Sequence, residues 1–198
     1  MINYIILGIS VVLLVLYLID LTKHKLTIKM MTIISMCSAI SYVLYLIEFI
    51  KYPQGGGISL FSMLPVMLLS ILYGRTAGLT GGFIFGLLKL LNGATVVHPA
   101  QFLLDYVLSA MALGLAGTFG TDKKIKIIFG GLFAVALSVL IYIISGVVYF
   151  GQYAPEGMNI WIYSIIYNCT SAGVEGLLSV IILAILPIKR IKKALKIS

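Results

Sequence analysis

Four ionisable side chains stand inside apolar stretches of the sequence. They are Glu48, Lys89, Asp105 and Glu175. A charge at the centre of a bilayer costs about 2.5 kcal/mol or more, so such a residue within a membrane span is expected to serve a function. A carboxylate among aromatic rings suits a flat organic cation, through charge pairing and cation–π attraction. These residues therefore predict a binding site for a small polar molecule.

Aromatic and amide side chains gather in the same parts of the predicted spans. They are Tyr106, Tyr142, Tyr149, Phe150, Gln152, Tyr163, Tyr167 and Asn168. Spacings of seven and eight residues put Tyr142, Tyr149 and Phe150 on one face of a helix. Such a cluster predicts an outward-opening pocket with stacking walls and a few hydrogen-bonding groups. Tyrosines also line membrane interfaces where no ligand binds, so each of these tyrosines could instead be such an interface residue.

Some of the charged residues have simpler alternative roles. Glu48 could instead form an ion pair with Lys51 at the membrane interface. Lys89 could instead balance the charge of Asp105 or Glu175. The sequence contains no Ser/His/Asp set, no metal-ligand spacing and no phosphate-binding loop. We therefore expect neither an enzyme nor a bound metal or other cofactor.

Transmembrane helices must position these groups. Hydrophobic residues make up 61% and charged residues 10% of the 198 positions, and the mean hydropathy is +1.14. In lipid every backbone polar group must pair within the protein, and the long apolar runs favour helices over a barrel. The fold class is thus predicted to be all-α, a polytopic membrane helix bundle. The net charge of +8 lies in clusters between these runs, which indicates membrane topology rather than nucleic-acid binding.

Seven apolar segments are predicted to cross the bilayer. They lie at residues 2–20, 27–50, 58–73, 76–92, 101–119, 127–150 and 160–187. Lysine and arginine cluster after the first, third, fifth and seventh segments, whereas the other loops hold only Lys51. Because cytoplasmic loops carry the excess of these residues, we predict an external N-terminus and a cytoplasmic C-terminus. The first segment lacks a basic start and a small-residue cleavage site, so we expect a retained helix.

Several motifs from the second segment onward carry a family resemblance. They are Tyr52–Gly56 (YPQGG), Ser62–Pro65 (SMLP), Gly74–Leu79 (GRTAGL), Val97–Tyr106 (VHPAQFLLDY), Ser145–Pro155 (SGVVYFGQYAP) and Tyr163–Asn168 (YSIIYN). In their order and spacing the chain resembles the thiamine-specific substrate-binding subunits, or S-components, of bacterial energy-coupling factor (ECF) transporters. The resemblance implies a six-helix membrane domain, here residues 21–198, in a bacterial cell membrane. Residues 1–20 would be an extra N-terminal transmembrane helix.

The resemblance also implies which residues contact the vitamin. They are Asp105, Tyr106, Phe150, Tyr163, Asn168 and Glu175. Phe150 would stack, whereas Tyr163 and Asn168 would hydrogen-bond the pyrimidine end. The family's ligand-contacting histidine aligns with Tyr142, so the chain departs from the family pattern at this position. We expect Tyr142 and Phe150 to face the thiazolium.

The implied partners are a membrane coupling subunit and two cytoplasmic ATPases. In the family, docking uses small residues on the first core helix, and Ser35 and Ala39 supply such residues here. Three alternatives remain at this point. The ligand could be a thiamine precursor or another heterocyclic vitamin. The chain could be a stand-alone proton-coupled transporter that uses Asp105, Glu175 and Lys89, or a structural or signalling membrane protein without a ligand.

Overall fold

Helices account for most of the chain. The computed structural model describes residues 1–52 and 56–196. Among the described residues, two segments of the bundle are compound rods in which α-helical turns flank a π-helical stretch. The elements are α1 (Ile2–Lys23), α2 (Ile28–Leu46), β1 (Glu48–Lys51), β2 (Gly57–Ser59), α3 (Leu64–Tyr73), α4 (Arg75–Leu88), the 3₁₀-helix η1 (Lys89–Asn92), α5 (Pro99–Phe102), the π-helix η2 (Leu103–Leu108), α6 (Ser109–Leu113), α7 (Lys124–Tyr149), the 3₁₀-helix η3 (Gly151–Tyr153), α8 (Ile160–Asn168), the π-helix η4 (Cys169–Gly173), α9 (Val174–Ile185) and α10 (Ile188–Ala194).

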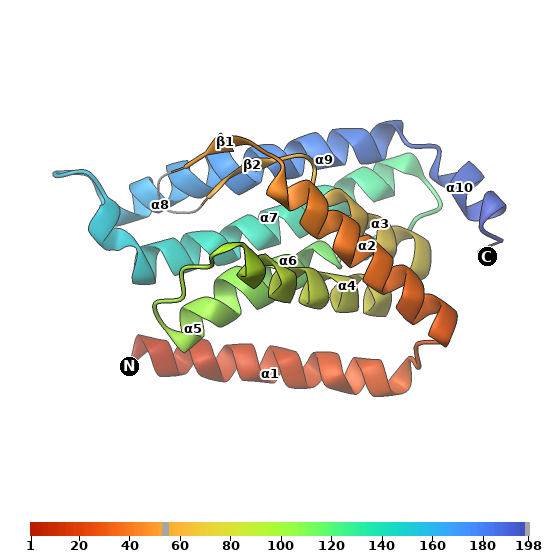
Figure 1. Ribbon diagram of the computed structural model, residues 1–198, viewed down its shortest axis with the longest axis horizontal. Helices are drawn as coiled ribbons and strands as arrows, with labels where there is room; N and C mark the ends of the chain where they lie inside the picture. Colours follow the sequence, from red (N-terminus) through yellow and green to blue (C-terminus); the bar gives the residue numbers. More distant parts are fainter. Residues whose placement is uncertain (53–55, 197–198) are drawn as a thin grey trace.

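The described residues contain four helical stretches that are long and apolar enough to cross a membrane. They are Ile2–Lys23, Ile28–Leu46, Lys124–Tyr149 and Ile160–Ile185. Helices α1, α7, α8 and α9 run lengthwise, α2 crosses them obliquely, and the two chain ends lie at opposite ends of the bundle (Figure 1). The predicted all-α membrane bundle is therefore confirmed.

Three of the predicted spans are shorter as helices than the apolar runs suggested. The run 58–73 begins as strand β2, and α3 starts only at Leu64, with a proline in its first turn. The run 27–50 leaves its helix at Leu46 and continues as β1. The run 101–119 is helical only to Leu113 and then proceeds in turns. Hydropathy marks what is apolar, but it does not distinguish a helix from an apolar strand or turn.

The two strands form a small antiparallel hairpin that lies beside α8 and α9 (Figure 1). Glu48 pairs with Ser59, Ile50 with Ile58, and Lys51 with Gly57. Pro53, Gln54 and Gly55, part of the first family motif, lie outside the described residues. The hairpin thus joins α2 to α3 across the ends of α8 and α9 (Figure 1).

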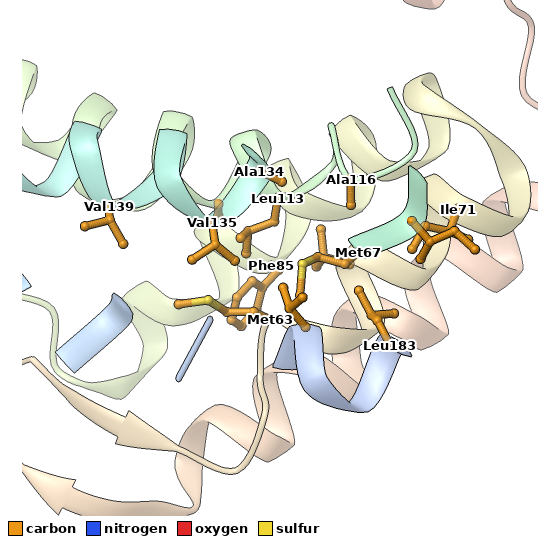
Figure 2. Close-up of a cluster of buried hydrophobic side chains, with 14 of the residues drawn as sticks. Met63, Met67, Ile71, Phe85, Leu113, Ala116, Ala134, Val135, Val139 and Leu183 are labelled. Carbon is orange, nitrogen blue, oxygen red and sulfur yellow. The ribbon is translucent and has the colours of Figure 1, made fainter. Parts of the chain in front are cut away.

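An apolar core joins α3, α4, α6, α7 and α9 (Figure 2). The residues that Figure 2 labels in this core are Met63, Met67, Ile71, Phe85, Leu113, Ala116, Ala134, Val135, Val139 and Leu183. In a membrane, where lipid is as apolar as the side chains, close van der Waals packing holds such helices together. Small residues allow that close approach.

Glycines bring α4 against the rod that contains η2 and α6. A methyl group added at Gly82 would overlap the carbonyl oxygen of Ala110, and one added at Gly86 would overlap that of Tyr106. Both obstacles are backbone atoms, which cannot rotate away as a side chain can. The two helices therefore depend on glycine at these positions for their spacing.

We predict that Gly82→Ala lowers the free energy of unfolding by about 1–3 kcal/mol, because the new methyl group forces α4 and α6 apart. Thermal unfolding in detergent measures the effect. Gly8→Ala in α1 is the matched control, since a methyl group there meets no atom within 4 Å. Equal melting temperatures for the two variants would contradict this account of the packing.

Candidate functional site

A cavity of about 370 Å³ lies among the ends of α2, α4, η2, α7, α8 and α9. This volume is within the range of small-molecule sites. All seven residues that the sequence predicted for the site line it: Asp105, Tyr106, Tyr142, Phe150, Tyr163, Asn168 and Glu175. Glu48 and Lys89 line it too, so the four ionisable residues singled out from the sequence share one chamber.

Asp105 and Tyr106 reach the cavity from the π-helix η2. A π-helix forms hydrogen bonds between residues five apart, one more than in an α-helix, and such turns are frequent at functional sites. Gln101 Nε2 donates to Asp105 Oδ2 at 2.6 Å and also to the Thr95 carbonyl at 3.2 Å. Gln101 is fully buried, and its Oε1 accepts from the Val97 amide. The loop before α5 and the Asp105 carboxylate are thus held by one amide side chain.

Lys89 projects into a box of aromatic rings. Its Nζ lies 5.4–5.8 Å from the ring centroids of four aromatic residues, which are Tyr45, Phe85, Tyr106 and Tyr142. It donates a hydrogen bond to the Tyr142 hydroxyl at 2.8 Å. The expected charge balance with Asp105 or Glu175 is not a direct contact, because no described residue forms an ion pair with Lys89. Ring faces stabilise the ammonium group instead.

Glu175 holds the hairpin and the turn that follows it. Its Oε2 accepts from the Ser59 amide and hydroxyl at 3.0 and 2.8 Å, and its Oε1 accepts from the Ser62 amide and hydroxyl at 2.9 and 2.6 Å. The side chain is only 4% exposed. A buried carboxylate with four donors is satisfied without a counter-ion. Glu175 therefore lines the cavity, but its oxygens are already committed to the protein.

The opposite wall carries the aromatic and amide groups of α7 and α8. Asn168 Nδ2 donates to the Ser164 carbonyl at 2.9 Å and approaches the Tyr142 carbonyl at 3.4 Å. The Phe150 ring, just beyond the end of α7, stacks on Tyr153 at 6.3 Å between centroids. Tyr163 lies one turn before Tyr167 in α8, and their ring centroids are 5.9 Å apart. Rings and amides thus face the cavity side by side.

Two residues of the predicted cluster lie elsewhere, and others were missed. Tyr149 does not line the cavity, because its hydroxyl donates to Asn3 of α1 and its ring stacks on His98. Gln152 is absent from the lining too. Sequence reasoning missed Tyr45 and Gln101. Gln101 stands one helical turn before Asp105, and this spacing was the available signal.

At the mouth of the cavity, Glu48 and Lys51 form an ion pair of 3.3 Å. The pairing predicted as the simple alternative for Glu48 is therefore confirmed. The Lys51 side chain is largely exposed, so the pair contributes little to stability. Both residues still line the cavity.

We predict that Glu175→Gln lowers the free energy of unfolding by at least about 2 kcal/mol, because an amide cannot accept four hydrogen bonds and places an N–H against a donor. Thermal unfolding of the purified protein is the measurement. Glu156→Gln, the same change in an exposed loop, is the control and should leave the melting temperature unchanged. A Glu175→Gln protein as stable as its control would show that these bonds do not hold the hairpin.

The chain has solved and curated relatives. It is 36% identical to the thiamine transporter ThiT of Bacillus subtilis (strain 168) over 151 residues, which cover 70% of this chain and 78% of that protein. It is 30% identical to ThiT of Lacticaseibacillus paracasei over 142 residues, 64% of this chain and 71% of that one.

Two solved structures share its fold at 24% sequence identity. ThiT from Listeria monocytogenes superposes with a TM-score of 0.71 over 83% of this chain and 95% of that chain. The S component of a bacterial ECF transporter superposes with a TM-score of 0.59 over 85% and 98%. Residues 31–195 match the model of the family described as Thiamine transporter protein (Thia_YuaJ). This is a family of transporters and not of enzymes. The match covers most of the chain, and the chain therefore belongs to the Thia_YuaJ thiamine transporter family.

Proposed function

We propose that this protein captures thiamine in the cavity as the substrate-binding membrane subunit of an ECF-type vitamin transporter. The observation that carries the proposal is the meeting of the Asp105 carboxylate with the Phe150 and Tyr163 rings in one chamber. Family membership supports the same function, and so does the identity of the relatives as thiamine transporters. Thiamine combines a cationic thiazolium with a neutral aminopyrimidine, and such a chamber offers a partner for each part.

The lining suggests how the vitamin is oriented. The Tyr142 ring already faces the Lys89 ammonium, so Phe150 is the better partner for the thiazolium. Asp105 would accept from the exocyclic amino group of the pyrimidine, and the Asn168 amide and Tyr163 hydroxyl would complete the recognition of this ring. Tyr106 would form a side wall. Glu175 would act indirectly, by fixing the hairpin over the cavity.

A proton-coupled transporter is the less favoured alternative. A relay through Asp105, Glu175 and Lys89 needs groups that exchange protons with one another. Glu175 instead accepts four bonds from Ser59 and Ser62, and Lys89 donates to Tyr142. The energy for uptake would then come from partner proteins, a membrane coupling subunit and two cytoplasmic ATPases.

The distribution of basic residues supports the proposed orientation. Lys192 of α10 donates to Thr121 in the turn before α7, so the two basic clusters at the C-terminus and before α7 lie together. This end is opposite to the one where α1 starts (Figure 1). We infer that the basic end faces the cytoplasm and the cavity faces outward. The family match begins at residue 31, which supports the view of residues 1–20 as an extra helix on a six-helix domain spanning residues 21–198.

Titration of the purified protein with thiamine in a calorimeter tests the ligand and the site together. Phe150→Ala and Asp105→Asn should each weaken binding by about tenfold or more, because they remove a cation–π partner and a charged acceptor. The matched controls are Phe129→Ala, on the exposed face of α7, and Asp122→Asn, in an exposed loop. Wild-type binding no tighter than millimolar, with tight binding of a different heterocycle, would overturn the choice of thiamine.

The orientation predicts which cysteines an impermeant maleimide reaches in intact cells. In a background with Cys37→Ser and Cys169→Ser, Glu156→Cys should be labelled from outside. Asp122→Cys should be labelled only after the membrane is permeabilised, because its loop carries the basic residues. The reverse pattern would place the cavity on the cytoplasmic side and refute the proposed direction of capture.

A further inference from the structure

Helix α1 lies outside the segment that matches the family, yet one of its faces is fitted to the core. Its buried residues are Ile6, Ser10 and Tyr17, and most of its other side chains are exposed. In Figure 1 it runs along the edge of the bundle beside α4 and α5, and the contacts include η2. The helix therefore touches the rod that carries Asp105 and Tyr106.

The first turn of α1 joins two segments that border the cavity. The Tyr149 hydroxyl donates to Asn3 Oδ1 at 3.0 Å, and Asn3 Nδ2 lies 3.4 Å from His98 Nε2. The His98 ring stacks on Tyr149 at 5.6 Å, and its Nδ1 accepts from the Ala100 amide to cap α5. One asparagine thus ties the end of α7, next to Phe150, to the start of the rod with Asp105.

Two further residues of α1 pack on the back of the π-helix. Ile6 shares a buried cluster with Ala100, Leu104 and Leu108. Tyr17 shares another with Val107 and Met111. Leu104 and Val107 flank the pair Asp105 and Tyr106, so α1 supports the π-helix directly behind the side chains that face the cavity.

The other end of α1 is fixed as well. The Tyr17 hydroxyl donates to Thr80 of α4 at 2.9 Å. Asp20 accepts from Arg75 at 2.5 Å and from Thr76 at 2.7 Å. Polar contacts at both ends hold the helix in register, because sliding by one turn would break all of them.

We propose that α1 is a brace that holds the π-helix η2 in the conformation that aims Asp105 and Tyr106 into the cavity. A π-helical turn is rare, and α1 packs on the side of η2 that carries Leu104 and Val107. Ile6 and Asn3 are the positioning residues. Neither lines the cavity, so they act on the ligand through η2. The effect on binding rests on the proposed function, whereas the effect on η2 does not.

The test compares two identical changes on opposite faces of α1. Ile6 is 8% exposed and Ile9 is 57% exposed. Ile6→Ala therefore removes contacts between α1 and η2, whereas Ile9→Ala shortens a side chain that faces lipid. We expect Ile6→Ala to weaken thiamine binding about tenfold, mainly through faster dissociation, because an unsupported site must be ordered by the ligand. Ile9→Ala should bind as the wild type does. Ile6→Val, which keeps most of the contact, should restore most of the affinity.

Hydrogen exchange without ligand provides the independent readout. Backbone amides of residues 98–108 should exchange faster in Ile6→Ala than in Ile9→Ala, while those of α9 remain unchanged. Equal exchange in the two variants would overturn the brace, whatever the ligand is. Faster exchange with no thiamine binding by the wild type would leave the brace standing and refute the proposed function.

A double-mutant cycle tests the Asn3 contact. Tyr149→Phe removes a hydrogen bond that Asn3→Ala removes as well, together with the His98 contact, so the double variant should lose no more affinity than Asn3→Ala alone. Additive losses would show that the two side chains act separately and would contradict the bridge.

Discussion

A charge placed among apolar groups must find its stabilisation in the protein, and the cavity is organised around that requirement. Each ionisable group of the lining has its own partner. Two serines hold Glu175, aromatic rings surround Lys89, and Gln101 binds Asp105. The partners of Glu175 and Lys89 come from elements that are distant in sequence, so the electrostatic need also fixes how the helices are placed. The same contacts therefore stabilise the charged groups of the cavity and hold the helices of the bundle together.

Close helix packing and local departures from the α-helix both help to place the side chains that line the cavity. Gly82 and Gly86 let α4 approach the rod of η2 and α6, and this approach brings Lys89 near Tyr106. The π-helical turns η2 and η4 both border the cavity. Asp105 lies within η2 and Asn168 immediately precedes η4, and both residues line the cavity.

The sequence predicted the membrane bundle and the gathering of its charged side chains in one cavity, because both follow from the cost of burying charge. Asp105 and Glu175 stand out in apolar runs, and the motifs around them mark the family. The partners were harder to foresee. Glu175 accepts hydrogen bonds from Ser59 and Ser62, which lie 116 and 113 residues earlier in the chain, and no local sequence pattern predicts such a contact. Tyr149 was misplaced for a related reason: its partner Asn3 lies on a helix that the periodicity of α7 cannot reveal.

The anchor of the hairpin has a consequence for the assembly of the protein. Ser59 and Ser62 precede α3, but the carboxylate that receives them is on α9, near the end of the chain. During synthesis the early segments therefore enter the bilayer while these serines still lack their acceptor. The chamber gains its cover only when the last long membrane segment arrives, so a chain released before α9 would carry most of the lining residues and still lack a closed site.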